Sequence, residues 1–304
     1  MTCIKAFLTL LVATCLAACS NSAPPEQLNT VKEGKPALWK LTGTKPRQKG
    51  TAYLFGTIHI LPKGIDWRSP VLEKALKQSD QLIIEVLGLE DTKNAAKIFS
   101  KLAISPNQPE LEQRIRPSLR DDLDAVIDKS NIPEFALDKM ESWAAALSLA
   151  SAQTAGLGLE SSEGVEKKLV AQFNGFKKPI EGLETIEQQL GYFDTLPESQ
   201  QREMLTTVVE EAADTKTSFE KLFNAWISGD VELIAQLAQS GILEDPKTRE
   251  KLLTARNLDW TEQLDKKMQQ PGISFVAVGA AHLAGPDAVQ TMLEKRGYKI
   301  EKIQ

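Results

Sequence analysis

Two apolar segments at opposite ends of the chain end in the same phrase, Gly-x-x-His. Residues 53–59 read Tyr-Leu-Phe-Gly-Thr-Ile-His, and residues 275–282 read Phe-Val-Ala-Val-Gly-Ala-Ala-His. His59 and His282 are the only histidines among the 304 residues. The apolar runs are typical of buried strands. We expect the fold to bring both strands, and with them both imidazoles, to one site. Imidazole is the commonest metal ligand and a frequent general base near neutral pH.

The rest of the chain predicts strands near both ends and a helical middle. The predicted strands cover residues 37–41, 52–58, 81–87, 178–182, 273–279 and 298–303. The predicted helices cover residues 69–79, 91–102, 110–128, 133–155, 163–173, 185–193, 197–213, 218–226, 231–240, 246–267 and 287–296. The order predicts an α/β fold with a central mixed sheet and a large helical insertion at about residues 90–175. Residues 298–303 alternate between apolar and charged side chains, which is typical of an edge strand.

The first 18 residues have the layout of a secretory signal peptide, with Lys5 followed by a largely apolar run. They lead into Leu-Ala-Ala-Cys, which resembles a bacterial lipobox. The resemblance implies cleavage before Cys19 and lipidation of that residue. The alternative is an ordinary signal peptide that is cut near residue 18 and leaves Cys19 unmodified. Residues 19–36 are polar and proline-containing, so we expect a flexible tether there and a folded domain over 37–304.

Cysteine content and net charge narrow the range of binding partners and cellular compartments that we expect. Of the three cysteines, Cys3 and Cys15 lie in the leader, so the mature chain is left with Cys19 and no internal disulfide. The net charge of −5 excludes the basic surface that nucleic-acid binding requires. Attachment to a membrane would therefore come from lipid on Cys19. In a Gram-negative host, Ser20 in place of an Asp favours sorting to the outer membrane of the cell envelope, facing the periplasm, over retention in the inner membrane.

Four polar side chains fall at the ends of predicted strands. His59 and His282 follow two of these strands, Glu85 lies near the end of a third, and Glu184 follows a fourth. Ligands bind at the carboxyl ends of strands in α/β sheets, so these groups would meet if the strands are parallel neighbours. The alternatives are turn histidines, a Glu85 that forms a salt bridge, and a Glu184 that merely favours a helix N-terminus.

Two histidines and one carboxylate are a sufficient ligand set for a catalytic metal with an open position. Arg256 and Asn257, adjacent on an amphipathic segment, could stabilise an oxyanion. They could equally belong to a solvated helix face. Four tryptophans are predicted to be core residues rather than a substrate platform: Trp67, Trp143, Trp226 and Trp260.

These residues resemble the TraB/PrgY/GumN family, the bacterial relatives of the TIKI proteins. The resemblance runs from about Trp39 to the C-terminus, and its most specific element is the pair of Gly-x-x-His motifs. Further similar segments are the strand with Glu85, residues 182–185, Ala225-Trp226 with Gly229-Asp230, and Arg256-Asn257. The resemblance implies a fold like that of erythromycin esterase and ChaN.

TIKI proteins are metal-dependent peptidases, so the resemblance implies a divalent metal (Mn, Co or Zn) held by His59, Glu85 and His282. In the leading hypothesis the chain is a lipid-anchored peptidase acting on a peptide or protein, with Glu184 as general base and Arg256 or Asn257 polarising the carbonyl. In the second hypothesis, which follows the esterase branch, His and Glu residues hydrolyse an ester or amide without metal. The third is a lipoprotein that binds a ligand without turnover.

Overall fold

The computed structural model describes residues 28, 31, 33–159 and 161–304. The expected signal peptide, residues 1–18, and the expected lipidation site at Cys19 lie outside the described residues. Of the expected tether over 19–36, only the last residues are described in continuity. There the backbone N–H groups of Gly34 and Lys35 already donate to carbonyls of the folded body.

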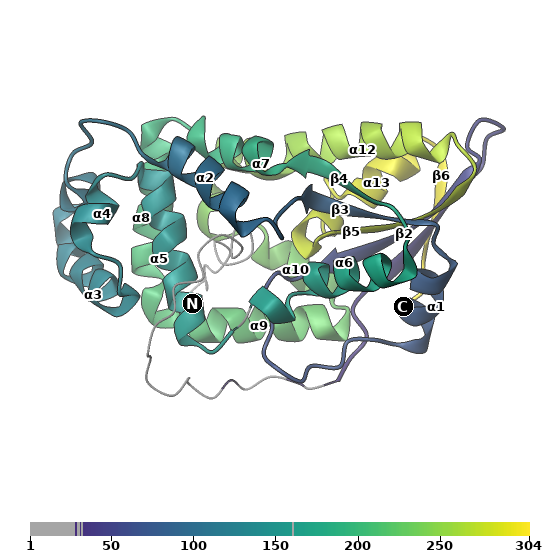
Figure 1. The fold of residues 1–304 in the computed structure, drawn as a ribbon, viewed down its shortest axis with the longest axis horizontal. Coiled ribbons are helices and arrows are strands. Elements are labelled where there is room, and N and C mark those ends of the chain that lie inside the picture. Colours follow the sequence, from purple (N-terminus) through teal and green to yellow (C-terminus); the bar gives the residue numbers. More distant parts are fainter. Residues whose placement is uncertain (1–27, 29–30, 32, 160) are drawn as a thin grey trace.

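A six-stranded mixed sheet forms the centre of the molecule, with the strand order β4-β3-β5-β2-β1-β6 (Figure 1). The strands are β1 (Leu38–Gly43), β2 (Gly50–Thr57), β3 (Gln81–Leu87), β4 (Ile180–Thr185), β5 (Gly272–Gly279) and β6 (Tyr298–Lys302). All six predicted strands are present, and β6 is an edge strand, as its alternating pattern indicates. The predicted α/β class with a mixed sheet is therefore confirmed.

Strands β2, β3, β4 and β5 are parallel neighbours, so their carboxyl ends lie on one edge of the sheet. β5 pairs with β2 as far as Thr57 and Gly279, but with β3 only as far as Ile84 and Ala277. β3 continues alongside β4 to Leu87. The sheet therefore opens between β3 and β5 just where Glu85 emerges. β1 and β6 are antiparallel and complete the other side of the sheet.

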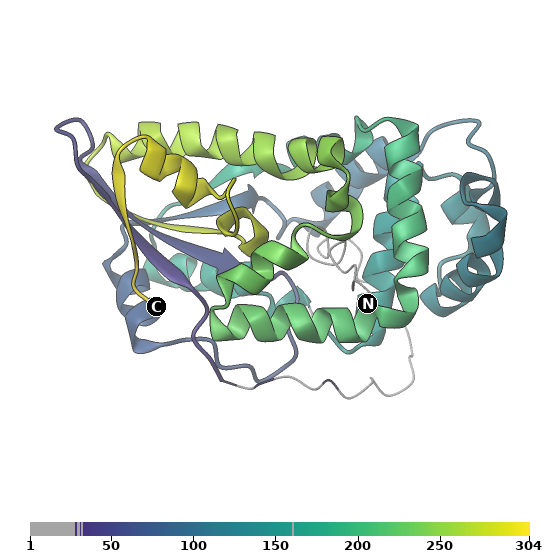
Figure 2. The ribbon, with the colours of Figure 1, turned by 180° about the vertical axis from the view of Figure 1, so that it is seen from behind.

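Helices cover both faces of the sheet (Figures 1 and 2). Before β4, the helices are α1 (Pro70–Gln78), α2 (Thr92–Ala103), α3 (Arg120–Ser130), α4 (Glu134–Asp138), α5 (Ser142–Gly156) and α6 (Val165–Phe176). After β4, they are α7 (Ile186–Asp194), α8 (Glu198–Glu210), α9 (Thr215–Ser228), α10 (Val231–Leu237), α11 (Pro246–Arg249), α12 (Ala255–Met268) and α13 (Val289–Lys295). A further helical group, which includes α2, α3, α4, α5 and α8, lies beyond the carboxyl ends of the parallel strands (Figure 1).

Three of the predicted helices are interrupted. The segment 110–128 breaks at Pro117, because a residue before proline is disfavoured in helical backbone, and Arg116 is extended there (ψ 144°). The segment 133–155 splits where Arg114 binds the carbonyls of Asp138 and Met140. The segment 246–267 contains a π-helical turn, η7 (Glu250–Thr254), between α11 and α12.

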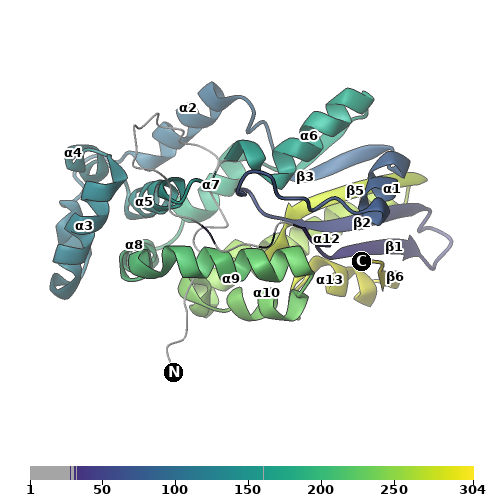
Figure 3. The ribbon, with the colours of Figure 1, turned by 90° about the horizontal axis from the view of Figure 1, so that it is seen from below.

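The two faces of the sheet belong to different parts of the hydrophobic core. On one face, side chains such as Phe55 and Phe275 join the larger cluster, which extends through α1, α6 and the helical group. On the other face, Leu54 and Val276 pack with Trp260 of α12 and with α13. Figure 3 shows α6 and α12 on either side of the strands. The sheet thus holds α6 and α12 at fixed positions beside its carboxyl edge.

Within the described ranges, no helix combines the length and apolar character needed to cross a membrane.

Candidate active site

The carboxyl edge of the sheet brings together the four residues that the sequence places at strand ends. His59 lies two residues after β2, and Glu85 lies inside β3. Glu184 lies near the end of β4 rather than beyond it, and His282 lies in η8 (Ala280–Leu283), which follows β5 directly. Both imidazoles are close enough to Glu85 to act electrostatically on its carboxylate. The condition that these strands are parallel neighbours is met.

Arg256 is the centre of the buried polar network behind this edge. Its side chain is only 1% exposed. Nε and Nη2 donate to the two oxygens of Glu184 at 2.8 and 2.9 Å, and Nη2 also donates to Oε1 of Glu85 at 2.7 Å. Burial alone would lower the pKa of the guanidinium, but the two carboxylates outweigh it and raise that pKa. Arg256 is therefore a permanent cation clamped between two acids.

The backbone before Arg256 helps to place it. The wide turn η7 precedes α12, and π-helical turns are frequent at functional sites. Nη1 of Arg256 donates to the carbonyl oxygen of Leu252 in this turn at 3.1 Å, and it faces Nε2 of His282 at 3.4 Å. With these contacts all five N–H groups of the guanidinium have partners. Arg256 and Asn257 are both buried, so they do not belong to a solvated helix face, which was the alternative that the sequence left open.

His282 is held in one tautomer by its neighbours. The amide nitrogen of Asn257 donates to the carbonyl oxygen of Asp287 at 2.7 Å, which turns Oδ1 of Asn257 toward the imidazole. Nδ1 of His282 lies 2.5 Å from that oxygen, so Nδ1 carries the proton and Nε2 keeps its lone pair toward Arg256. Burial and the adjacent Arg256 lower the pKa of His282 to about 3. Its ring packs on Trp260, with 4.3 Å between centroids.

Glu85 is ionised although it is buried. Burial would raise its pKa, but Arg256, the two imidazoles and the N–H of Gly279 lower it to about 2. Its Oε1 also accepts from the side-chain amide of Gln189 at 2.7 Å, and Oε2 accepts from the N–H of Gly279 at 3.0 Å. A carboxylate offers about four acceptor positions. The described residues use three of them, so one remains on Oε2.

His59 has a partner that the sequence analysis missed. Its Nδ1 lies 2.8 Å from Oε1 of Glu166 in α6, and the hydroxyl of Thr57 donates to the same oxygen. Burial would lower the pKa of His59, but the carboxylate of Glu166 reverses the effect and raises it to about 9. Glu166 reads in the sequence as an ordinary acidic residue in the first turn of a helix. Only the packing of α6 against β3 reveals its role.

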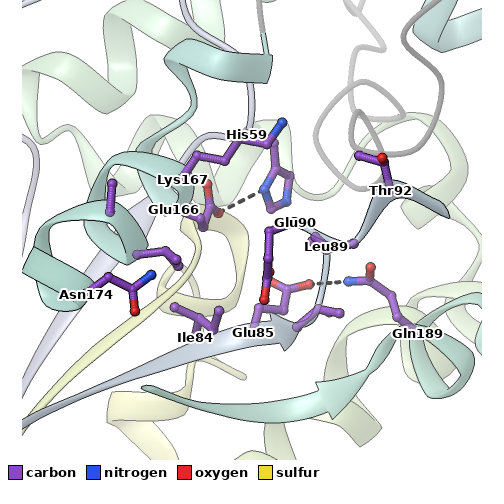
Figure 4. Close-up of a pocket in the computed structure, with 13 residues that line it drawn as sticks. His59, Ile84, Glu85, Leu89, Glu90, Thr92, Glu166, Lys167, Asn174 and Gln189 are labelled. Atoms are coloured by element: carbon purple, nitrogen blue, oxygen red, sulfur yellow. Dashed lines mark hydrogen bonds and ion pairs between the residues drawn. The ribbon is translucent and has the colours of Figure 1, made fainter. Parts of the chain in front are cut away.

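A cavity of about 420 Å³ opens at this edge between β3, α6 and α7 (Figure 4). The figure shows Glu85 and Gln189 joined on one side of it, and His59 and Glu166 joined on another. It is lined by His59, Ile84, Glu85, Val86, Leu89, Glu90, Thr92, Glu166, Lys167, Val170, Ala171, Asn174 and Gln189. Of the predicted site residues, His59 and Glu85 reach the cavity wall, whereas Glu184, His282, Arg256 and Asn257 form the network behind Glu85.

The predicted core tryptophans are all buried: Trp67, Trp143, Trp226 and Trp260. Two of them also support the site. The indole N–H of Trp260 donates to Oε1 of Glu184 at 2.8 Å. The indole N–H of Trp226 donates to the carbonyl oxygen of Gly56, inside the first Gly-x-x-His phrase, at 2.8 Å.

The ligating atoms of His59, Glu85 and His282 are not arranged as the expected metal centre would require. Glu85 is already paired with a buried guanidinium, and Nδ1 of His282 is committed to Asn257 while its Nε2 faces the same guanidinium. Among the described residues, no three His, Cys, Asp or Glu side chains are grouped closely enough to hold a metal ion. A cation at this place would have to share Glu85 with Arg256, through the remaining position on Oε2.

Comparisons with known proteins match most of the chain. A sequence model of the TraB/PrgY/gumN family matches residues 37–302. An uncharacterized protein of Treponema pallidum (strain Nichols) is 22% identical in an alignment that covers 94% of this chain and 89% of that protein. No solved structure was found to match the chain.

Proposed function

The chain belongs to the TraB/PrgY/gumN family, and on that premise we propose that it is a hydrolase of ester or amide bonds that works with Glu85 and His59. The observation that carries the proposal is that Glu85 and His59, two groups of opposite charge, line one cavity. The pKa of Glu85 is lowered to about 2 and that of His59 is raised to about 9. Near neutral pH the cavity therefore presents a carboxylate and an imidazolium.

Glu85 would activate the attacking water. The free acceptor position on its Oε2 can take one hydrogen of a water molecule and orient the water oxygen toward a carbonyl carbon. As the new C–O bond forms, the proton passes to Glu85. Arg256 and Gln189 hold the other carboxylate oxygen, so the group is fixed before the substrate arrives.

His59 would complete the reaction as the general acid. Its Nδ1–H is bound to Glu166, and no other residue of the described ranges binds Nε2–H, which can act on the substrate. When the bond between the acyl carbon and the leaving oxygen or nitrogen breaks, His59 gives its proton to the leaving group. Return of the proton from Glu85 to His59 through solvent restores the starting state.

Glu184, Arg256, Asn257 and His282 would act through Glu85 as positioning residues. Both oxygens of Glu184 bind Arg256, and Trp260 adds a third hydrogen bond. A general base needs an oxygen within reach of the water. Glu85 meets that requirement from the cavity wall, whereas Glu184 lies behind it.

Chelation separates this proposal from a metal-dependent peptidase. The full-length protein, purified in detergent, is assayed on a p-nitrophenyl ester, a peptide and an acyl amide, before and after removal of divalent metals. We expect activity to survive chelation. We expect Glu85→Gln and His59→Gln each to lower kcat by about 10²-fold or more. Activity that disappears on chelation and returns with Mn, Co or Zn would establish the metal-dependent peptidase instead.

Elemental analysis gives an independent readout. A metal-dependent enzyme should carry stoichiometric metal that is lost in the His59→Ala/His282→Ala double variant, whereas we expect none in either protein. If the protein hydrolyses none of the three substrate classes but binds one of them saturably, the result would favour a binding protein without catalysis.

We also propose that lipid on Cys19 anchors the protein in the envelope, on the side of the outer membrane that faces the periplasm. What supports this is the apolar leader followed by Leu-Ala-Ala-Cys. Cys19→Ser should move the protein from the membrane fraction to the soluble fraction, or leave it uncleaved at the leader. An unchanged membrane fraction with normal cleavage would contradict lipidation.

A further inference from the structure

One face of α6 runs along the cavity and changes character along its length. Glu166, Lys167, Val170, Ala171 and Asn174 all line the cavity, at the spacing that places residues on one side of a helix. From Glu166 to Asn174 the helix rises by about 12 Å, at roughly 1.5 Å per residue. The cavity is therefore bordered by a wall of about this length.

The reactive groups lie at one end of this wall. Glu166 holds His59 at the N-terminal end of α6. Val170 and Ala171 form an apolar stretch in the middle, and Asn174 follows. Figure 4 shows Asn174 beside Ile84 and well away from His59. Three apolar residues from β3 and the loop after it add to the lining: Ile84, Val86 and Leu89.

We infer that the substrate of this site carries an unbranched aliphatic acyl chain, which lies along α6 over Val170 and Ala171 with its carbonyl between Glu85 and His59. This inference rests on the proposed hydrolase function. With bonds of about 1.5 Å, a chain of roughly eight to ten carbons spans the length of the wall.

An extended peptide fits the lining less well. Each residue of a bound peptide brings a backbone N–H and C=O that need partners, and extended peptides usually find them on a free strand edge. The lining strand residues, 84–86, belong to β3, which already pairs with β4 on one side. On its other side β3 pairs with β5 as far as Ile84, and beyond that point Glu85 takes the N–H of Gly279. An aliphatic chain needs no such partners and gains from each methylene that it buries.

Binding of uncharged amides tests the chain without requiring turnover. Acetamide, butyramide, hexanamide and octanamide are titrated into the full-length protein by calorimetry, with Glu85→Gln as a second sample that should not hydrolyse them. We expect affinity to rise by roughly twofold to fourfold per methylene. Equal affinity for acetamide and octanamide would overturn the inference.

A matched pair of leucine variants locates the chain. Ala171→Leu fills the middle of the wall, whereas Gly156→Leu adds the same side chain in α5, outside the cavity lining, where a Cβ meets nothing within 4 Å. We expect Ala171→Leu to weaken octanamide binding by tenfold or more and to leave acetamide unchanged. Gly156→Leu should change neither. Equal effects of the two variants on octanamide would contradict the placement.

Turnover distinguishes a failure of this inference from a failure of the proposed function. Esters with acyl chains of two to sixteen carbons should show kcat/KM rising to about eight to ten carbons. Hydrolysis without chain-length preference, or faster cleavage of peptides than of acyl amides, would overturn the aliphatic substrate and leave the hydrolase standing. Affinity that rises with the length of the acyl chain, with no hydrolysis of any substrate, would overturn the hydrolase and leave the aliphatic ligand standing.

Discussion

The charge on His59 decides which proton transfer this side chain can perform. With Glu166 as its partner, His59 has a pKa of about 9 and is an imidazolium near neutral pH. An imidazolium can donate a proton but cannot accept one. In the proposed mechanism the acid and the base are thus set by neighbours rather than by residue type, because the carboxylate would accept the proton and the histidine would donate it.

The pH profile of kcat/KM tests this assignment. We expect a plateau around neutral pH and a fall as pH rises through about 9, where His59 loses its proton. Glu166→Gln removes the charge that raises the pKa, so the fall should move to lower pH. Glu163→Gln is the control, because Glu163 forms a half-buried pair with Lys168 and does not line the cavity. A rate that increases through pH 9 would mean that neutral His59 is a base.

His282 tests whether the second histidine acts as an acceptor for Arg256. His282→Gln can place an oxygen near the position of Nε2, whereas His282→Asn reaches only the position of Nδ1. We expect the Asn variant to be less stable than the Gln variant by about 1.5–3 kcal/mol, the usual contribution of a hydrogen bond to a charged group. Chemical denaturation measures the difference. Equal destabilisation by both substitutions would show that the contact with Arg256 contributes nothing.

At the scale of elements, the close approach of β2 to η8 explains the first glycine of the paired motif. A Cβ on Gly56 would lie 3.1 Å from Cα and 3.2 Å from Cβ of Ala280. These are tighter than ordinary contacts, and one partner is backbone. Gly279 has a different reason, since a Cβ there would meet Oε2 of Glu85 at 3.3 Å. Gly56 therefore lets η8 approach β2, and Gly279 leaves room for the carboxylate of Glu85.

Two glycine-to-alanine substitutions should have opposite effects on stability. Gly56→Ala should lower the free energy of unfolding by about 1–3 kcal/mol, because β2 and η8 must separate. Gly191→Ala, in α7, should raise it by about 0.4–1 kcal/mol, because its Cβ meets nothing within 4 Å and alanine restricts the unfolded chain. Urea denaturation of both variants gives the comparison. A neutral Gly56→Ala would contradict the tight contact.

The boundaries of helices and strands show where the local sequence pattern is sufficient to predict an element and where it is not. The strand at 81–87 was predictable to the residue, because a short apolar run between polar residues has one simple solution. The single helix expected over 133–155 is instead two, since Arg114 captures the carbonyls of Asp138 and Met140 from a distant part of the chain. Helical periodicity in the sequence carries no information about that contact.

At the scale of the whole molecule, three shifted pKa values shape stability against pH. The folded state raises the pKa of His59 to about 9, so its contribution is fully present below about pH 6.5 and is lost as pH rises through 9. Urea midpoints should therefore fall between pH 7 and 9.5, and less so in Glu166→Gln. An identical alkaline loss in that variant would show that the His59–Glu166 pair is not responsible.

The acid side depends on His282 and Glu85. The folded state keeps His282 neutral down to about pH 3, whereas the unfolded chain protonates it below about 6.5, so stability should decrease as pH falls through that window. Glu85 adds a loss only below about pH 4.5, as pH falls toward 2. Between pH 6.5 and 4.5 the His282→Gln variant should therefore lose less stability than the wild type. A parallel loss in both proteins would contradict a neutral buried His282.

The sequence by itself determined the sheet and the residues at its edge. Apolar runs of strand length and the repeated Gly-x-x-His phrase are local properties, and parallel strands place their carboxyl ends together whatever the intervening helices do. His59, Glu85, Glu184 and His282 were predictable on that ground. Only the tertiary structure decided which partners they have. Arg256 and Glu166 reach the site from helices far away in the sequence, and it is their charges that set which groups carry protons.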